Sequence, residues 1–248
     1  MSVDIGNSSP KCNHDKSGAV QIDSCFNNVW IKRNNPLLII QNSYMQHFHS
    51  EIRECIIVSS ESLVEIVFHG RGGQGAVTAA NLLVAAALKD GNKGVQAFPF
   101  FGAERRGAPV RAFARISEDE IHLRSEIYNP DIVIVLDESI MDIVDVLKGL
   151  KKDGKILINT RKKPEDFEFS KKFSVFTVDA TDIALKNEIL VGGIPVVNTP
   201  ILGAVPKILD RVTLKSIQGT VKGKWKGDLA SKNMKATQDA FDEVEGMK

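Results

Sequence analysis

The sequence predicts an α/β fold, namely one three-layer, Rossmann-like domain with a mixed, mainly parallel sheet, preceded by a poorly structured N-terminal extension. Val64–Ala87 runs from an apolar, β-branched stretch through a glycine-dense turn directly into an apolar helix. Strand-like and helix-like segments then alternate to the C-terminus, which is typical of α/β domains. Residues 1–62 lack this alternation. The predicted division is therefore an irregular extension at 1–62 and an α/β domain at 63–248.

The extension contains only two short apolar patches, Pro36–Ile40 and Cys55–Val58, which are too few to build a core. A second interpretation is that it is not translated at all. The start would then be a non-AUG codon near Val58, Leu63 or Val64. An intact mass that includes Met1–Ser62 would contradict that interpretation.

Composition restricts the class of protein. The net charge is +1 and 43% of residues are hydrophobic, so the chain shows no global attraction to nucleic acid or anionic membrane. No apolar run approaches the roughly 18–20 residues that span a bilayer, and the N-terminus has no secretory signal pattern. We therefore expect a cytoplasmic protein.

All three cysteines lie in the extension, and their odd number argues against a disulfide framework. The residues in this region that could ligate a metal ion are Cys12, His14, Cys25, His47 and His49. They match no paired C-x2-C spacing, which favours unrelated thiols over a metal site.

The first half of the α/β domain reads in order as strand, turn, helix and strand. We expect a buried strand at Val64–Phe68, a helix at Ala76–Leu88 and a second strand at Val95–Phe98. A long loop rich in aromatic residues, proline and glycine follows. Val110–Ile116 then alternates in polarity, and a polar turn predicts that it forms a β-hairpin with Ile121–Leu123.

The second half begins with the clearest strand of the chain, five apolar residues between Asp131 and Asp137. Apolar spacing predicts an amphipathic helix at Glu138–Leu150. Further strands are expected at Lys155–Asn159 and Phe173–Val178. The predicted C-terminal helices are Thr181–Leu190 with Thr181 as its N-cap, one starting at Asn198-Thr199-Pro200, and two capped by Thr213 and Asp228.

The turn Gly70–Gly75 has the G-x-G-x-x-G spacing of dinucleotide sites and lies between a strand and a helix, where backbone N–H groups can face an anion. A dinucleotide site also requires an acidic residue at the end of the second strand. That position falls in Phe98–Phe101, which has no carboxylate. Two alternatives stay open. An arginine could bind the 2′-phosphate of NADP, or the glycines could serve only to let the strand and the helix pack closely.

Glu104-Arg105-Arg106 lies between Phe101-Gly102 and Gly107-Ala108-Pro109, an unusual amount of bulk and backbone restriction for a plain surface loop. Arginine binds phosphate, carboxylate or a partner's acid through its planar fork. We favour an anion site or a subunit interface over a solvated charge cluster. The candidate site residues are Gly70, Arg71, Gly72, Gly73, Gln74, Gly75, Glu104, Arg105, Arg106 and Gly107.

No catalytic constellation is found. After Cys55 there is no cysteine, and His69 and His122 are the only histidines of the domain. We interpret His69 as a structural residue rather than a base. A domain that has a loop at the ligand-binding edge of its sheet but no catalytic group is typical of one part of a larger enzyme.

His69–Ala80 (HGRGGQGAVTAA) and Phe98–Val110 together closely resemble the γ subunits of 2-oxoacid:ferredoxin oxidoreductases. Ala103–Val110 (AERRGAPV) is more similar to the pyruvate and 2-ketoisovalerate branch. Asp131–Asp137 and Asn198–Gly203 carry the same resemblance, which covers about Val64 to Val244. It does not cover the extension.

The resemblance implies oxidative decarboxylation of a 2-oxoacid, with pyruvate the expected substrate, to acyl-CoA, CO2 and reduced ferredoxin. It also implies α, β and δ partner subunits that hold thiamine diphosphate, Mg and iron–sulfur clusters, with no catalytic residue and no cofactor on this chain alone. The chain would serve assembly. Coenzyme A binding through Arg105, Arg106 or the glycine turn is a hypothesis. The alternatives are a freestanding NAD(P)-dependent enzyme and a purely structural interaction module.

Overall fold

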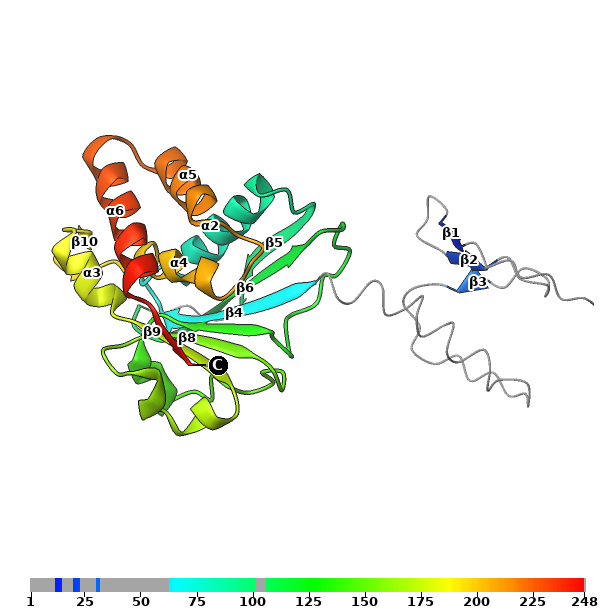
Figure 1. Ribbon diagram of the computed structural model, residues 1–248, viewed down its shortest axis with the longest axis horizontal. Helices are drawn as coiled ribbons and strands as arrows, with labels where there is room; N and C mark the ends of the chain where they lie inside the picture. Colours follow the sequence, from blue (N-terminus) through cyan, green and yellow to red (C-terminus); the bar gives the residue numbers. More distant parts are fainter. Residues whose placement is uncertain (1–11, 15–19, 23–29, 32–62, 101–105, 248) are drawn as a thin grey trace, which may run out of the picture. The chain divides into compact units, whose positions relative to one another are not determined.

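The computed structural model describes residues 12–14, 20–22, 30–31, 63–100 and 106–247 (Figure 1). The chain divides into two compact units, Met1–Glu54 and Cys55–Lys248. In the first unit three short strands form an antiparallel sheet in sequence order. They are β1 Cys12–His14, β2 Val20–Ile22 and β3 Trp30–Ile31.

The second unit is built on a seven-stranded sheet with the order β12-β9-β8-β7-β4-β6-β5. Its strands are β4 Val64–Arg71, β5 Gly94–Pro99, β6 Pro109–Ser117, β7 Ile132–Val135, β8 Lys155–Asn159, β9 Ser174–Val178 and β12 Glu245–Met247. β4, β5, β7, β8 and β9 run in one direction, whereas β6 and β12 run against them. The prediction of a mixed, mainly parallel sheet is therefore confirmed.

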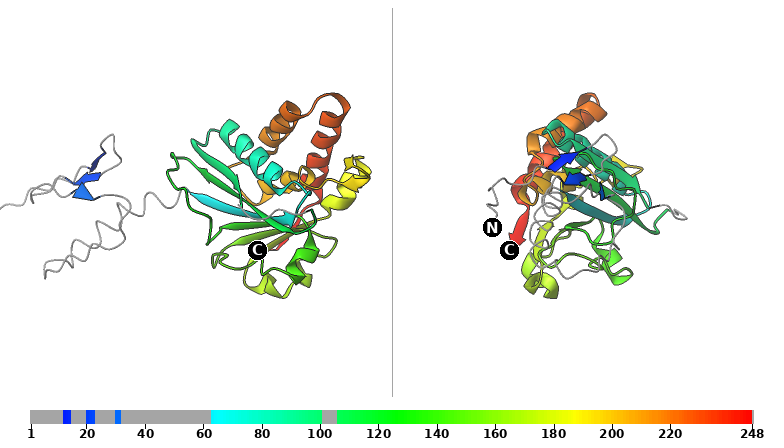
Figure 2. Two further views of the ribbon diagram at one scale, coloured as in Figure 1. Left: turned by 180° about the vertical axis from the view of Figure 1, so that it is seen from behind. Right: turned by 90° about the vertical axis from the view of Figure 1, so that its right-hand side faces the viewer.

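The α-helices lie together on one face of this sheet (Figures 1 and 2). They are α2 Ala76–Lys89, α3 Ala180–Lys186, α4 Pro200–Ala204, α5 Leu214–Lys224 and α6 Gly227–Glu243. The remaining elements are the 3-10 helices η1 Glu138–Asp142, η2 Pro164–Asp166, η3 Glu168–Lys171 and η4 Val205–Lys207, and the short strands β10 Leu190–Val191 and β11 Ile194–Pro195.

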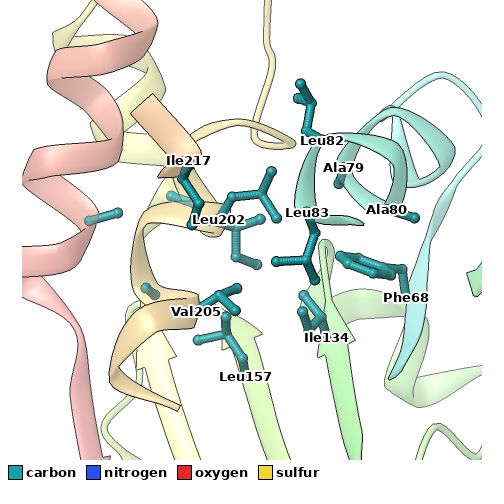
Figure 3. Close-up of a cluster of buried hydrophobic side chains, with 14 of the residues drawn as sticks. Phe68, Ala79, Ala80, Leu82, Leu83, Ile134, Leu157, Leu202, Val205 and Ile217 are labelled. Carbon is teal, nitrogen blue, oxygen red and sulfur yellow. The ribbon is translucent and has the colours of Figure 1, made fainter. Parts of the chain in front are cut away.

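Alternation along each strand sends side chains to both faces of the sheet, where they form three clusters, and the smallest consists of Val67, Phe113 and Ile127. Phe68 and Ile134 pack with Leu83 of α2 and Leu202 of α4 in the larger core, under the helices (Figure 3). A smaller core on the opposite face is closed by η1, η2 and the segments that follow η1. Its buried members are Val133, Val135, Ile140, Val146, Leu150, Ile156, Ile158, Phe167 and Val175. Each fully buried aliphatic or aromatic side chain contributes about 1.5–3 kcal/mol, so the sheet is held from both sides.

The predicted hairpin between Val110–Ile116 and Ile121–Leu123 is wrong. β6 pairs antiparallel with β4 on one edge and with β5 on the other, so both of its edges are occupied. Residues 121–123 form no strand. Their carbonyl groups instead accept hydrogen bonds from the Gln96 side chain, at 3.3 Å for Ile121 and 3.0 Å for Leu123. Alternating polarity identified the strand, but it carried no information about its partners.

The predicted helix at Glu138–Leu150 is also wrong, because it ends as a 3-10 helix at Asp142. Gly149 has φ 81°, which a helix cannot contain, and a side chain there would overlap the carbonyl oxygen of Tyr128. Two of the C-terminal helices begin one or two residues earlier than predicted. α3 begins at Ala180 with Asp179 as its N-cap, and α6 begins at Gly227, so that Asp228 lies in its first turn. Thr213 caps α5 as predicted.

Within the described residues, no helix is both long and apolar enough to cross a membrane.

Candidate functional site

The glycine turn leaves the carboxyl end of β4 and leads into α2. Gly73 and Gly75 have φ values of 98° and 82°, a region that side chains disfavour, so these two glycines are required by the turn itself. Gly75 is the N-cap of α2 and offers no side chain to cap it. Among the described residues, no side chain caps the N-terminus of this helix by a hydrogen bond.

The turn is joined by backbone hydrogen bonds to the segment just before β6. Gly72 N donates to Ala108 O at 2.9 Å, and Gly107 N donates to Gly72 O at 3.0 Å. A side chain on Gly73 would meet Arg106 Cγ at 3.9 Å, so the stem of Arg106 runs across Gly73. The structure thus brings together the two stretches that the sequence singled out. Glu104 and Arg105 lie outside the described residues.

Arg71 is engaged by the protein on all three guanidinium nitrogens. Its Nε donates to Asp137 Oδ2 at 3.1 Å, its Nη2 to Ser139 Oγ at 2.8 Å and its Nη1 to Gly107 O at 3.1 Å. This geometry ties the ends of β4 and β7 to the loop before β6. Arg71 therefore acts as a brace for the site more readily than as a contact for a ligand.

Gln74 belongs to the same network. Its Oε1 accepts from Arg71 N at 2.7 Å, and its Nε2 donates to Asp137 Oδ2 at 2.9 Å. Partial burial acts to raise the pKa of Asp137. Hydrogen bonds from Ser139 and Gln74 and the charge of Arg71 outweigh burial and hold that pKa below its usual value. Asp137 is thus a stable anion that accepts hydrogen bonds from two segments, the glycine turn with Arg71 and Gln74 and the start of η1 with Ser139.

Asp137 and Ser139 were not among the predicted site residues. Asp137 was recognised only as the polar end of a strand. A general signal was available, because the carboxyl ends of neighbouring parallel strands meet at the ligand edge of an open α/β sheet. What the sequence could not show is that β7 lies next to β4 in this sheet.

Asn198 is a further residue that sequence reasoning did not assign to the site. It lies just before α4 and its side chain is packed against Gly75, where any side-chain carbon would overlap its Nδ2. Asn198 Oδ1 accepts from Thr199 Oγ1 at 3.2 Å, which orients the amide. The NH2 group therefore faces the start of α2.

His69 is buried on β4 and its pKa is lowered to about 4, first by loss of hydration and then by the positive charge of Arg111. It is consequently neutral at pH 7. The prediction that it is structural, and not a base, agrees with this environment.

The sheet order argues against a classical dinucleotide site. In that fold the strand after the first helix lies beside the first strand, so that its terminal acid reaches the ribose. Here β5 follows α2 but is separated from β4 by β6. The two strands that flank β4, and therefore the glycine turn at its end, are β6 and β7 instead.

The chemistry of the site is that of a donor surface. It presents the N-terminus of α2, the Asn198 amide and the guanidinium of Arg106, and its one central carboxylate is neutralised by Arg71. Within the described residues, no three histidine, cysteine or acidic side chains come together as metal ligands.

A pocket of about 490 Å³ shares Ser139 with this network and is lined by Glu138, Ser139, Met141, Asp142, Lys162 and Phe167. Lys162 is paired with Glu138 at 2.5 Å. Its acidic lining makes this pocket a poor place for an anion, so the donor surface is the stronger candidate.

The family model, the related sequences and the related structure found by comparison with known proteins agree with one another. The family model for pyruvate ferredoxin/flavodoxin oxidoreductase matches residues 65–243. The pyruvate/ketoisovalerate oxidoreductases common subunit gamma of Thermococcus kodakarensis is 54% identical over 185 residues, covering 73% of this chain and 97% of that protein. The pyruvate synthase subunit PorC of Methanocaldococcus jannaschii is 50% identical over 182 residues, covering 73% and 97%. The crystal structure of pyruvate oxidoreductase subunit PORC from Thermotoga maritima superposes with a TM-score of 0.64 at 36% identity, covering 75% and 99%.

Proposed function

The chain belongs to the pyruvate ferredoxin/flavodoxin oxidoreductase family, as a gamma subunit of a pyruvate/2-oxoacid:ferredoxin oxidoreductase, and we propose that it binds part of coenzyme A and helps to assemble that enzyme. The complete enzyme would convert a 2-oxoacid and coenzyme A to acyl-CoA and CO2, passing the electrons to ferredoxin. Pyruvate and 2-ketoisovalerate remain the candidate substrates.

The cofactors of this reaction are assigned to partner chains. Thiamine diphosphate, Mg and iron–sulfur clusters would be held by the α, β and δ subunits. Support comes from the sequence of the α/β domain itself, because residues 63–248 contain no cysteine that could hold an iron–sulfur cluster. The gamma chain alone would then be inactive.

The family model also supports the proposed division of the chain, since its match begins at residue 65. We take 63–248 as the gamma domain and 1–62 as an extension to it. The family membership supports the cytoplasm as the working location.

The observation that carries the coenzyme A proposal is the position of Arg106. Its stem crosses Gly73, and its backbone lies beside Gly72 in a β-bridge, so the residue is held at the glycine turn while its side chain stays exposed. Coenzyme A carries a diphosphate and a 3′-phosphate. An arginine close to the N-terminus of a helix is a common arrangement for binding such groups.

The direct test is Arg106→Ala, alone and with Arg105→Ala, in the assembled enzyme. We expect the apparent KM for coenzyme A to rise about tenfold, since a charged hydrogen bond contributes about 1.5–3 kcal/mol. The KM for the 2-oxoacid should stay constant. Arg124→Ala removes another exposed arginine outside the site and serves as the control. If the KM for coenzyme A and the assembly of the complex both stay unchanged, the proposed role of this loop is wrong.

The assembly role has a separate observation behind it. β10 and β11 form a hairpin whose turn, Gly192-Gly193, has positive φ at both residues. Large apolar side chains are exposed on it, including Val191 at 71% and Ile194 at 54%, with Leu185 of α3 close by in sequence at 46%. Exposed apolar groups gathered in one place are typical of protein interfaces. A subunit of the same oxidoreductase is the partner we propose.

A further inference from the structure

The face of β5 and β6 that is turned away from the α-helices carries arginines beside aromatic rings. Arg111, Phe113 and Arg115 share this face of β6, because alternate residues of a strand point to the same side. The guanidinium carbon of Arg111 lies 4.2 Å from the ring centroid of Phe100, and that of Arg115 lies 5.5 Å from the ring centroid of Phe98. The ring centroids of Phe98 and Phe113 are 5.2 Å apart. Two guanidinium groups and three rings therefore form one continuous layer.

The register of the sheet gives the two arginines different neighbours on β4. Arg115 is opposite Glu65, and its Nε donates to Glu65 Oε1 at 2.9 Å. Arg111 is opposite His69, which is neutral at pH 7. Among the described residues, the Arg111 guanidinium donates no hydrogen bond and forms no ion pair. Arg111 therefore keeps a positive charge that the described part of the chain does not compensate.

Asp145 does not supply the missing acid. It raises the pKa of His69, but by less than Arg111 lowers it. Its Oδ1 accepts from Leu147 N at 3.1 Å, and within the part of the chain that the structure describes no ion pair joins it to Arg111. Arg111 is half-buried, so a carboxylate brought to it would interact more strongly than at a fully solvated arginine.

The surroundings of Arg111 have the composition of a protein interface. Phe100 is half-buried, and the segment after β6 adds Leu123, which is 45% exposed, and Tyr128, which is 70% exposed. This segment lies against the same face through Ile127, which packs with Phe113. Aromatic residues and arginine are enriched in protein interfaces and contribute most of their binding energy. Exposed apolar side chains beside a charge favour a protein partner over a small anion, which would leave them in water.

We propose that Arg111 and Phe100 form a docking site for a carboxylate on the surface of a partner subunit of the same oxidoreductase. The planar guanidinium can donate two parallel hydrogen bonds to a carboxylate while the ring lies beside it. The surrounding apolar side chains would exclude water from the ion pair and so strengthen it. This inference rests on the assembly role in the proposed function and adds the chemistry that the partner must present.

The first test compares the affinities of the full chain and of Arg111→Gln for the purified partner subunits. We expect a loss of about tenfold or more, since removing one member of a desolvated ion pair leaves the other charge unpaired in the interface. The Tm of the isolated chain should not fall. Arg161→Gln is the matched control, because that exposed arginine is already paired with Asp179 at 2.8 Å, and its affinity should stay constant. Unchanged affinity in Arg111→Gln overturns the proposal.

The second test uses charge and shape separately. Raising the ionic strength from about 0.05 to 0.5 M should weaken the binding of the unsubstituted chain more steeply than that of Arg111→Gln. Arg111→Lys keeps the charge but not the planar fork, so it should recover only part of the lost affinity. The same salt dependence in the unsubstituted chain and Arg111→Gln overturns the proposal. If Arg111→Gln fails to fold, Arg111→Lys decides, and an affinity equal to that of the unsubstituted chain overturns it.

Two other acceptors for Arg111 are outcomes of further measurements. Glu104 of this chain lies outside the described residues, and a double-mutant cycle of Arg111→Gln with Glu104→Gln on the stability of the isolated chain tests it. Additive effects support a partner's acid, whereas coupled effects assign the acid to this chain and overturn the proposal. If partner affinity stays constant in Arg111→Gln while the KM for the 2-oxoacid or coenzyme A rises, Arg111 binds a small anion and the proposal is wrong.

This inference and the proposed function fail in different ways. If replacing Val191 and Ile194 by glutamine weakens assembly but Arg111→Gln does not, the assembly role stands and the inference about Arg111 is wrong. If the unsubstituted chain binds no partner subunit, the assembly role itself is wrong and this inference falls with it.

Discussion

Arg71 and Asp137 are 66 positions apart in the sequence, and Arg71 Nε donates to Asp137 Oδ2 at 3.1 Å. The pair joins the ends of two neighbouring parallel strands, β4 and β7. Because Gln74, Ser139 and Gly107 are bonded to one or other member of the pair, it fixes the glycine turn relative to the loop that carries Arg106. The geometry of the donor surface therefore depends on one carboxylate whose two oxygens are both bonded within the protein.

Asp137→Asn tests this dependence. An amide at this position places N–H groups opposite Arg71 or Gln74, so at least one of their hydrogen bonds is lost. We expect the free energy of unfolding to fall by about 1–3 kcal/mol near neutral pH, measured by urea denaturation. Asp228→Asn, which removes one side of an exposed ion pair with Lys232, should have little effect. Equal effects of the two substitutions would show that the network does not stabilise the fold.

The sign of the pH dependence follows from the lowered pKa of Asp137. Its contribution is complete above its ordinary pKa of 3.8 and is lost as the pH falls through the lower folded value. The difference between the wild-type chain and Asp137→Asn should consequently shrink at acidic pH.

Gly75→Ala tests the packing of the helix start against Asn198. The left-handed φ of 82° makes alanine unfavourable by about 1–2 kcal/mol, and the overlap with the Asn198 amide adds about 1–3 kcal/mol. Gly91→Ala is the matched control, because Gly91 has φ 93° and open space around it, so only the backbone effect should appear. Urea denaturation of both variants measures the difference. In an Asn198→Ala background the excess loss of Gly75→Ala should disappear, and its persistence would contradict the packing argument.

His69 predicts a loss of stability at mildly acidic pH. Its pKa is lowered from 6.5 to about 4 on folding, so protonation favours the unfolded chain. The stability is complete above about pH 6.5 and decreases as the pH falls towards 4, by about 3 kcal/mol in total. His69→Leu should flatten the Tm profile between pH 7 and 4. His122→Gln, an exposed change, should leave the profile as in the wild-type chain, and a parallel profile in His69→Leu would refute the assignment.

Much of the fold could be predicted because its signals are local. The apolar stretch at Val64–Phe68, the glycine turn and the helix that begins at Ala76 are recognisable from composition and period within 24 residues. The proline at position 200 and the threonine at 213 marked helix starts for reasons of backbone chemistry, and α4 and α5 begin beside them.

The errors concern contacts that are distant in sequence. The partners of β6 are set by which strands lie on either side of it, and no local pattern encodes that order. The helix at Glu138–Leu150 ends already at Asp142, and at its far end the left-handed backbone of Gly149, packed against Tyr128, is incompatible with the helical spacing of apolar residues. Arg71 was predicted as a ligand or interface residue, and its ion pair with a carboxylate 66 residues away had no signal in the sequence. Asn198 was overlooked because its role depends on a glycine 123 residues upstream.

The exposed hairpin β10–β11 gives the prediction that bears on assembly. Val191 and Ile194 are paired across the two strands, so both side chains project from one face of a hairpin whose strands pair only with each other among the described residues. Asn198, three residues after β11, contacts Gly75, which places this segment near the candidate site. A partner bound to the hairpin would therefore lie close to the donor surface.

The double variant Val191→Gln, Ile194→Gln should weaken binding to the purified partner subunits of the oxidoreductase by about tenfold or more, because removing two buried apolar side chains from an interface loses about 1.5 kcal/mol or more. The Tm of the isolated chain should stay constant, since both side chains are exposed there. Leu88→Gln alters an apolar residue that is 57% exposed at the far end of α2 and should assemble normally. Unchanged affinity in the double variant would place the interface elsewhere. If instead the unsubstituted chain forms dimers by itself and the double variant does not, the hairpin binds a second copy of this chain and the proposed partner is wrong.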